Sequence, residues 1–165
     1  MFIACIDPGL SGTGIAIWQS ISWNRKKPEP ESVASFRPLS FMSGIKSIDK
    51  YLSIKKVSSV YLEQANYFGG GSVKGQMVAE KQDLIVLVEF IGGLKAICGM
   101  RGIKVLMIPA IKWKGTLPKN VVQERILKII PNAEEYCRTS HAFDALGIGL
   151  ATMGLINVSQ DKTNV

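Results

Sequence analysis

Short apolar runs alternate in this chain with longer segments in which apolar residues recur at helical spacing. Five runs rich in β-branched or aromatic residues predict strands over residues 2–7, 14–18, 32–37, 58–63 and 103–108. Helical spacing or helix-forming composition predicts helices over residues 43–54, 73–99, 118–130 and 141–156. Pro118 is expected to open the third of these helices, and Ser140 to cap the last.

The predicted elements follow one another as βββαβαβαα, and the glycine-rich segment after residue 7 predicts a hairpin between the first two strands. A chain of 165 residues that is 47% hydrophobic can bury one good core but is short for two. We therefore expect a single α/β domain over residues 1–158. The polar residues 159–165 are expected to form a flexible tail.

The net charge of the chain bears on its binding partner, and its cysteines bear on the compartment in which it works. The formal charge of +7 and pI near 9.4 favour an acidic partner such as nucleic acid, although an ordinary solvated surface also explains them. Cys5, Cys98 and Cys137 have no metal-binding spacing and are expected to be reduced thiols. The apolar start lacks a basic region and is interrupted by Asp7, so we expect neither a signal peptide nor a membrane anchor, and a cytoplasmic location.

Four side chains that could bind a metal ion lie at the ends of predicted elements. Asp7 and Glu63 each end a β-rich run, whereas His141 and Asp144 are three residues apart and share one face of the last helix. The residues around Asp144 are apolar, and a carboxylate in such a helix is costly unless it is paired or bound to metal.

Each of these residues also has a simpler structural interpretation. Asp7 precedes Pro8 and Gly9, as a turn residue would, and Glu63 could pair with a surface lysine. His141 could be a first-turn histidine behind a cap, and Asp144 a favourable charge near a helix N-terminus. Two acids at strand ends together with two ligands on one helix face favour the functional interpretation.

Such a cluster suits phosphodiester cleavage, which builds negative charge on the phosphoryl oxygens, the attacking water and the leaving oxygen. Two Mg²⁺ ions about 4 Å apart stabilise this charge and need several carboxylate oxygens. His141, neutral above a pKa of about 6.5, could serve as a metal ligand or orient the water.

Three motifs resemble the RuvC family of Holliday junction resolvases in content, order and spacing. They are IDPGLSGTG at residues 6–14, YLEQ at 61–64 and HAFDAL at 141–146. The resemblance spans nearly the whole chain. It implies a ribonuclease-H-like fold, with a mixed five-stranded sheet and helices on both faces. On this match Asp7, Glu63 and Asp144 correspond to the metal-binding acids, and His141 to a position that is Asp or His in the family.

The activity that the resemblance implies is that of a metal-dependent endodeoxyribonuclease that resolves four-way DNA junctions by paired symmetric nicks. The expected cofactor is Mg²⁺, two ions per site, with Mn²⁺ as a substitute. RuvC proteins act as dimers, since a junction offers two symmetric strands to cut. A homodimer interface is expected on the helix over 73–99, unless that helix only covers its own sheet.

Two further groups of residues are expected to contact DNA. Some RuvC proteins carry a phenylalanine three residues after the glutamate; this chain has Asn66 there, followed by Tyr67 and Phe68, and either aromatic could stack on an unpaired base. A small hydrophobic plug is the alternative for this pair. Lys112, Lys114 and Lys119, in a predicted loop, are the candidates for binding phosphate.

Three rival functions stay open. The first hairpin also resembles the first phosphate loop of sugar kinases and actin-like ATPases, but these need a second lobe that 165 residues do not provide. A non-catalytic binder of branched DNA would not need four ligand-capable residues. A nuclease of the same fold that cuts RNA–DNA hybrids or other branched DNA is harder to separate, since loops and assembly decide the substrate.

Overall fold

The computed structural model describes residues 1–20, 28–37, 40–65 and 74–156, with only the helical backbone over 74–81. Its strands are β1 Phe2–Asp7, β2 Thr13–Gln19, β3 Ser32–Phe36, β4 Val57–Gln64 and β5 Lys104–Pro109. Its helices are α1 Phe41–Ile54, α2 Lys74–Met100, α3 Ala110–Trp113, α4 Lys119–Ile129, α5 Ala133–Tyr136 and α6 Ser140–Thr152. The predicted tail at 159–165 lies outside the described residues.

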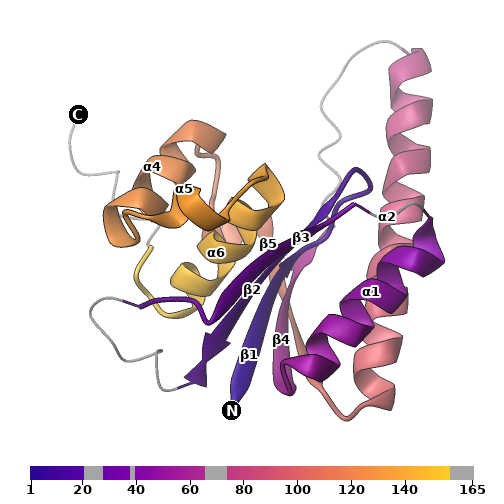
Figure 1. Cartoon of the computed structure of the whole chain (residues 1–165). Coiled ribbons are helices and arrows are strands. Elements are labelled where there is room, and N and C mark those ends of the chain that lie inside the picture. The colour runs from indigo at the N-terminus through magenta and orange to yellow at the C-terminus, as the bar shows by residue number, and fades with distance from the viewer. Residues whose placement is uncertain (21–27, 38–39, 66–73, 157–165) are drawn as a thin grey trace.

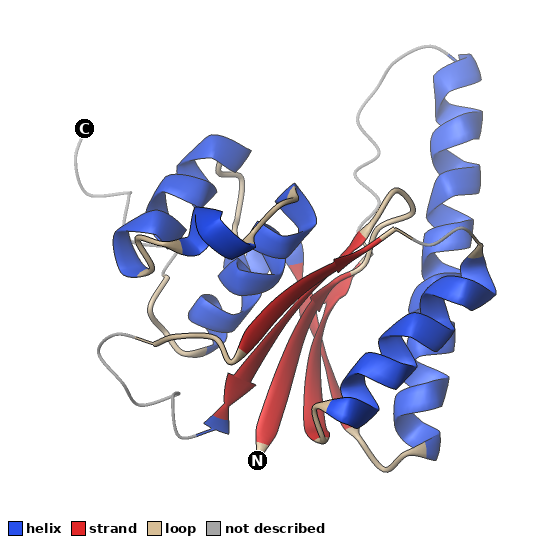
Figure 2. Ribbon diagram, in the orientation of Figure 1, coloured by secondary structure: helices blue, strands red, loops and turns tan. Residues whose placement is uncertain are grey.

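The strands form one mixed sheet in the order β3-β2-β1-β4-β5. β1 pairs antiparallel with β2, and β2 with β3, whereas β1 and β5 both run parallel to β4. Helices α1 and α2 cover one face of the sheet, and α4, α5 and α6 cover the other (Figures 1 and 2). The sequence-based prediction of a mixed five-stranded sheet with helices on both faces is confirmed.

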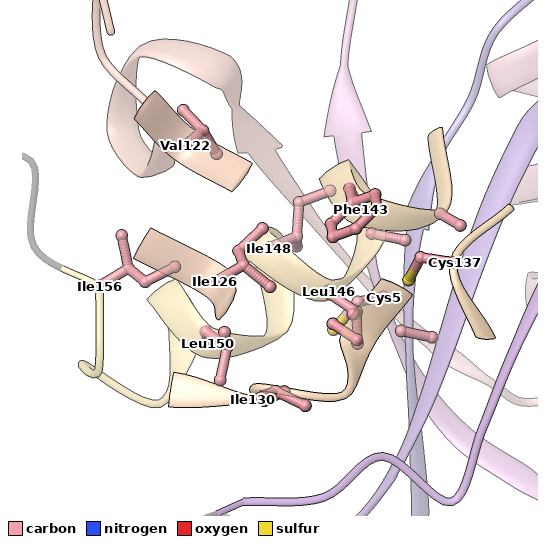
Figure 3. Packing of buried hydrophobic residues seen from close by; sticks show 14 of the residues in the cluster. Cys5, Val122, Ile126, Ile130, Cys137, Phe143, Leu146, Ile148, Leu150 and Ile156 are labelled. Carbon is pink, nitrogen blue, oxygen red and sulfur yellow. The ribbon is translucent and has the colours of Figure 1, made fainter. Parts of the chain in front are cut away.

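Successive side chains of each strand point to opposite faces of the sheet and so form two hydrophobic cores, one on each face. Ile6 and Ile15 point toward α1 and α2, while Cys5, Ala16 and Trp18 point toward α6. On the second face α6 is buried along most of its length, and its Leu146, Ile148 and Leu150 are fully enclosed by α4 and the sheet (Figure 3). This explains why α6 is nearly all apolar rather than amphipathic.

Glycines allow α6 to lie directly against the sheet. A Cβ atom on Gly14 of β2 would overlap the backbone carbonyl group of His141, and one on Gly149 of α6 would overlap the Trp18 indole. Glycine at position 149 lowers the intrinsic stability of the helix, but it allows the close contact between α6 and β2.

Several boundaries differ from the sequence-based prediction. The short helices α3 and α5 were not predicted, because four residues are too few to show a period. Thr139, not Ser140, caps α6, since its hydroxyl accepts a hydrogen bond from the Ala142 amide at 3.2 Å. Helix α6 ends at Thr152 rather than 156, and Gly154 follows with a φ of 73° that suits a chain reversal.

Cys5, Cys98 and Cys137 are all buried free thiols, as predicted. Within the described segments, no helix combines the length and the apolar character needed to cross a bilayer.

Gly149→Ala should destabilise the protein by about 1–3 kcal/mol, because the added methyl group meets the enclosed Trp18 ring. The matched control is Gly99→Ala in α2, where a Cβ meets nothing within 4 Å and should be neutral or stabilising by up to about 1 kcal/mol. Urea denaturation measures the unfolding free energy of both variants. Equal stability of the two variants would contradict the close packing of α6 on β2.

Candidate active site

Two acids lie side by side at the carboxyl edge of the sheet. Asp7 is the last residue of β1, and Glu63 follows Leu62, the partner of Ile6 across the parallel β1–β4 pair. Asp7 and Glu63 stand two residues after Cys5 and Tyr61, which face α6, so strand alternation directs both carboxylates to that face. The parallel pairing of β1 and β4 therefore places the two acids together.

The first turns of α6 bring the other two predicted residues to the same edge. His141 Nδ1 lies 2.6 Å from Asp7 Oδ2, and Asp144, one turn further along the helix, is only 8% exposed. Gly9 and Gly12 in the β1–β2 turn lie against the His141 ring, where a Cβ on Gly9 would overlap it. The hairpin and the helix thus fix the position of the imidazole from two sides.

A lysine joins the two remaining acids. Lys114 Nζ lies 3.4 Å from Glu63 Oε1 and 3.5 Å from Asp144 Oδ2, in ion pairs that are largely shielded from solvent. The same ammonium lies 4.8 Å from the centroid of the Trp113 ring. Lys114 was predicted to bind DNA, and the structure places it among the acids.

Trp113 is a site residue that the sequence-based analysis did not select. Its indole Nε1–H donates a hydrogen bond of 3.1 Å to Glu63 Oε2, and its ring is 1% exposed in a notch left by Gly147 of α6. The available signal was a tryptophan between two lysines just after a strand parallel to the one bearing Glu63. Trp113 orients Glu63 and could not be assigned without the fold.

The other predicted DNA contacts are only partly brought to the acids. Lys119 begins α4 and is exposed; its charge opposes the rise in the pKa values of His141 and Asp144 without outweighing it. Lys112 is exposed on α3. Lys112 and Lys114 lie in α3 and at its C-cap instead of in the predicted loop. Lys119 lies at the start of α4, within the helix predicted from Pro118. Tyr67 and Phe68 lie outside the described residues.

The electrostatics of the cluster show the cost of confining several acids. Burial, followed by the charge of Asp7, raises the pKa of Glu63 to about 7, and burial also raises the pKa of Asp144. The hydrogen bond to Asp7 raises the pKa of His141. Burial alone would lower the pKa of Lys114, but the charges of Glu63, Asp144 and Asp7 outweigh it and raise that pKa.

The cluster therefore attracts cations, and its donor set suits a divalent metal. Carboxylate oxygens and an imidazole are ligands that Mg²⁺ and Mn²⁺ accept, and the Lys114 ammonium already stands between two of the acids. Among the residues that the structure describes, no three such side chains already converge as ligands of one ion. Metal binding would need Glu63 and Asp144 to exchange their contacts with Lys114 for the metal.

Sequence comparison finds no matching protein-family profile and no matching curated protein. Solved structures do match. Thermus thermophilus RuvC in complex with a Holliday junction substrate gives a TM-score of 0.66 at 18% identity, over 95% of this chain and 98% of that chain. The fowlpox virus resolvase in complex with Holliday junction DNA gives 0.53 at 18% identity, over 93% and 97%. The chain has the ribonuclease-H-like fold of these resolvases, as its motifs predicted.

The unfolding free energy of the protein in EDTA should fall as the pH rises from 5 to 8. The pKa of Glu63 is about 7 against an ordinary 4.5, so its stabilising contribution is complete below about pH 4.5 and is lost as the pH rises through 7. This amounts to at most about 3 kcal/mol. The raised pKa of His141 acts in the same direction, with its contribution lost above about pH 6.5.

Denaturant titrations at a series of pH values test this dependence. Glu63→Gln should remove most of it, whereas Glu124→Gln, at an exposed position of α4, should leave it as in the native protein. A Glu63→Gln variant with the native pH dependence would show that Glu63 is not the group responsible.

Proposed function

We propose that this protein is a metal-dependent endonuclease that resolves four-way DNA junctions by paired symmetric nicks. The observation that carries this proposal is the meeting of Asp7, Glu63, His141 and Asp144 at one sheet edge. Support comes from the fold, which is shared with two resolvases whose structures contain Holliday junction DNA. The net charge of +7 and the lysines at the site suit a nucleic-acid substrate.

Asp7, Glu63 and Asp144 are the residues that would hold Mg²⁺, or Mn²⁺ in its place, with His141 as a further ligand. Two bound ions would stabilise the charge on the attacking and leaving oxygens of the phosphodiester. Burial is the main reason that the pKa values of Glu63 and Asp144 are raised, and repulsion from the Asp7 carboxylate adds to the effect. Neutralising that repulsion gives the site its affinity for divalent cations.

The protein side chains have separate tasks in the proposed reaction. Asp7 accepts a hydrogen bond from the Nδ1–H of neutral His141, which favours that tautomer and leaves Nε2 as a base or ligand. Trp113 holds one oxygen of Glu63 and so limits the directions in which that carboxylate can turn. Lys114, once displaced from the acids, lies close enough to neutralise a phosphate oxygen of the DNA.

A dimer would place two such sites on the two symmetric strands of a junction. Helix α2 exposes apolar side chains that its own sheet does not cover: Ile85 is 59% exposed, Val86 41% and Val88 53%. We propose this surface, the α2 apolar surface, as the homodimer interface. The buried free thiols are consistent with the cytoplasm as the place of action.

A labelled synthetic four-way junction with Mg²⁺ should receive symmetric nicks, while linear duplex and RNA–DNA hybrid of the same sequence stay intact. Asp7→Asn should lower the cleavage rate at least about 100-fold, because it removes a metal ligand, and EDTA should abolish cleavage. Glu124→Gln, which also removes one negative charge but lies exposed on α4, is the matched control and should cut normally.

The alternatives give different products in this assay. Equal cutting of duplex or hybrid would keep the metal site and reject junction selectivity. Tight junction binding without cutting in either Mg²⁺ or Mn²⁺ would indicate a non-catalytic binder. Cutting by Asp7→Asn at the native rate would contradict the assigned site.

Ile85→Asp should weaken self-association at least tenfold, since a charge in an apolar interface loses solvation without gaining a partner. Ile54→Asp, at a 65% exposed position at the end of α1, is the control and should associate as the native protein does. Sedimentation equilibrium measures the self-association constant of both variants. A monomeric native protein that still makes paired nicks would refute the dimer proposal.

A further inference from the structure

A cavity of about 280 Å³ opens beside His141, next to the proposed metal site. Its lining comes from three segments that are distant in the sequence: Ser11 in the β1–β2 turn, Ser35 and Arg37 at the end of β3, and Arg138 to His141 at the start of α6. Ser35 and Thr139 are joined by a hydrogen bond of 2.7 Å, which ties the β3 side of the cavity to the α6 side. We call this cavity the arginine pocket.

The chemistry of the arginine pocket suits an oxyanion. Arg37 and Arg138 are exposed cations, and guanidinium groups bind phosphate oxygens in bidentate fashion. The hydroxyls of Ser11, Ser35 and Ser140 can donate further hydrogen bonds. No carboxylate is found among the described residues that line the pocket, in contrast to the acid cluster on the other side of His141.

The order of the strands puts this pocket and Lys114 on opposite sides of the acids. The pocket lies at the β2–β3 side of the sheet, whereas Lys114 follows β5 at the other edge, with Asp7 and Glu63 between them on β1 and β4. A DNA strand that crosses the carboxyl edge of the sheet would therefore meet the arginines of the pocket on one side of the acids and Lys114 on the other. His141 belongs to both the pocket and the acid cluster, so the two are adjacent.

We propose that the arginine pocket binds a backbone phosphate of the DNA strand that is cut, a neighbour of the scissile phosphate. The inference rests on the proposed nuclease function, because it is the acid cluster that identifies the scissile position. Held in the pocket on one side and by Lys114 on the other, the DNA strand is fixed across the acids. The pocket thereby sets which phosphodiester reaches His141 and Asp7.

Junction binding by the native protein, Arg37→Gln, Arg138→Gln and the double variant, measured in Ca²⁺ at several salt concentrations, tests the pocket. The double variant should bind about tenfold more weakly at low salt, and the slope of log K against log salt should fall by about 1, as expected for one lost phosphate contact. Lys104→Gln is the control: Lys104 is exposed, but at the opposite end of β5, about 13 Å along the strand from the carboxyl edge.

A neutral methylphosphonate, placed in turn at each position near the cut, locates the contact. At one position it should weaken binding by the native protein and by Lys104→Gln, yet cause no further loss in the Arg37→Gln/Arg138→Gln variant. That pattern assigns the phosphate to the pocket, and a variant that merely loses stability would not produce it.

The outcomes separate this inference from the function on which it rests. If the native protein binds and cuts junctions but the arginine variants keep the native salt slope, the pocket proposal is overturned and the nuclease stands. If the methylphosphonate effects are the same in the native protein and the double variant, the pocket proposal is likewise overturned. If the native protein binds no branched DNA at all, the proposed function fails and the inference fails with it.

Discussion

Confinement of several carboxylates in a small and largely dry volume is the constraint on which the rest of this structure depends. Burial, with the charge of Asp7 added to it, raises the pKa values of Glu63 and Asp144. Asp7, Glu63 and Asp144 would also repel one another at this edge without compensation. The compensation comes from Lys114 and His141, each paired with an acid. These two groups offset part of the negative charge that the three acids bring together.

The close approach of α6 to the sheet creates this confinement. Gly14 lets the first turn of α6 touch β2, and Gly147 makes room for the Trp113 ring, which in turn reaches Glu63. A larger residue at either glycine would move His141 or Trp113 away from the acids. The same small residues therefore determine both how the apolar helix packs and where the polar side chains of the site lie.

The fold and the four candidate ligands could be predicted from sequence because their signals are local. Strands show as apolar runs, and Asp7 and Glu63 mark strand ends, so parallel pairing brings them together once the sheet order is guessed. The role of Trp113 had no local signal, since it depends on the notch at Gly147, far along the chain. Arg37 and Arg138 went unselected for the same reason: they meet only when β3 and α6 pack together.

The two sets of cations at the sheet edge differ in how strongly solvent screens them. Lys114 is part of a shielded ion-pair network, so added salt changes its interaction with Glu63 and Asp144 little. The exposed guanidinium groups of Arg37 and Arg138 interact through water and are screened on a scale of about 10 Å at ordinary ionic strength. In the proposed complex, salt should therefore control how firmly the pocket holds a DNA strand, while the charge balance inside the acid cluster persists. The proposed binding of the substrate and the charge balance of the acids are in this way electrostatically separate, although His141 belongs to both.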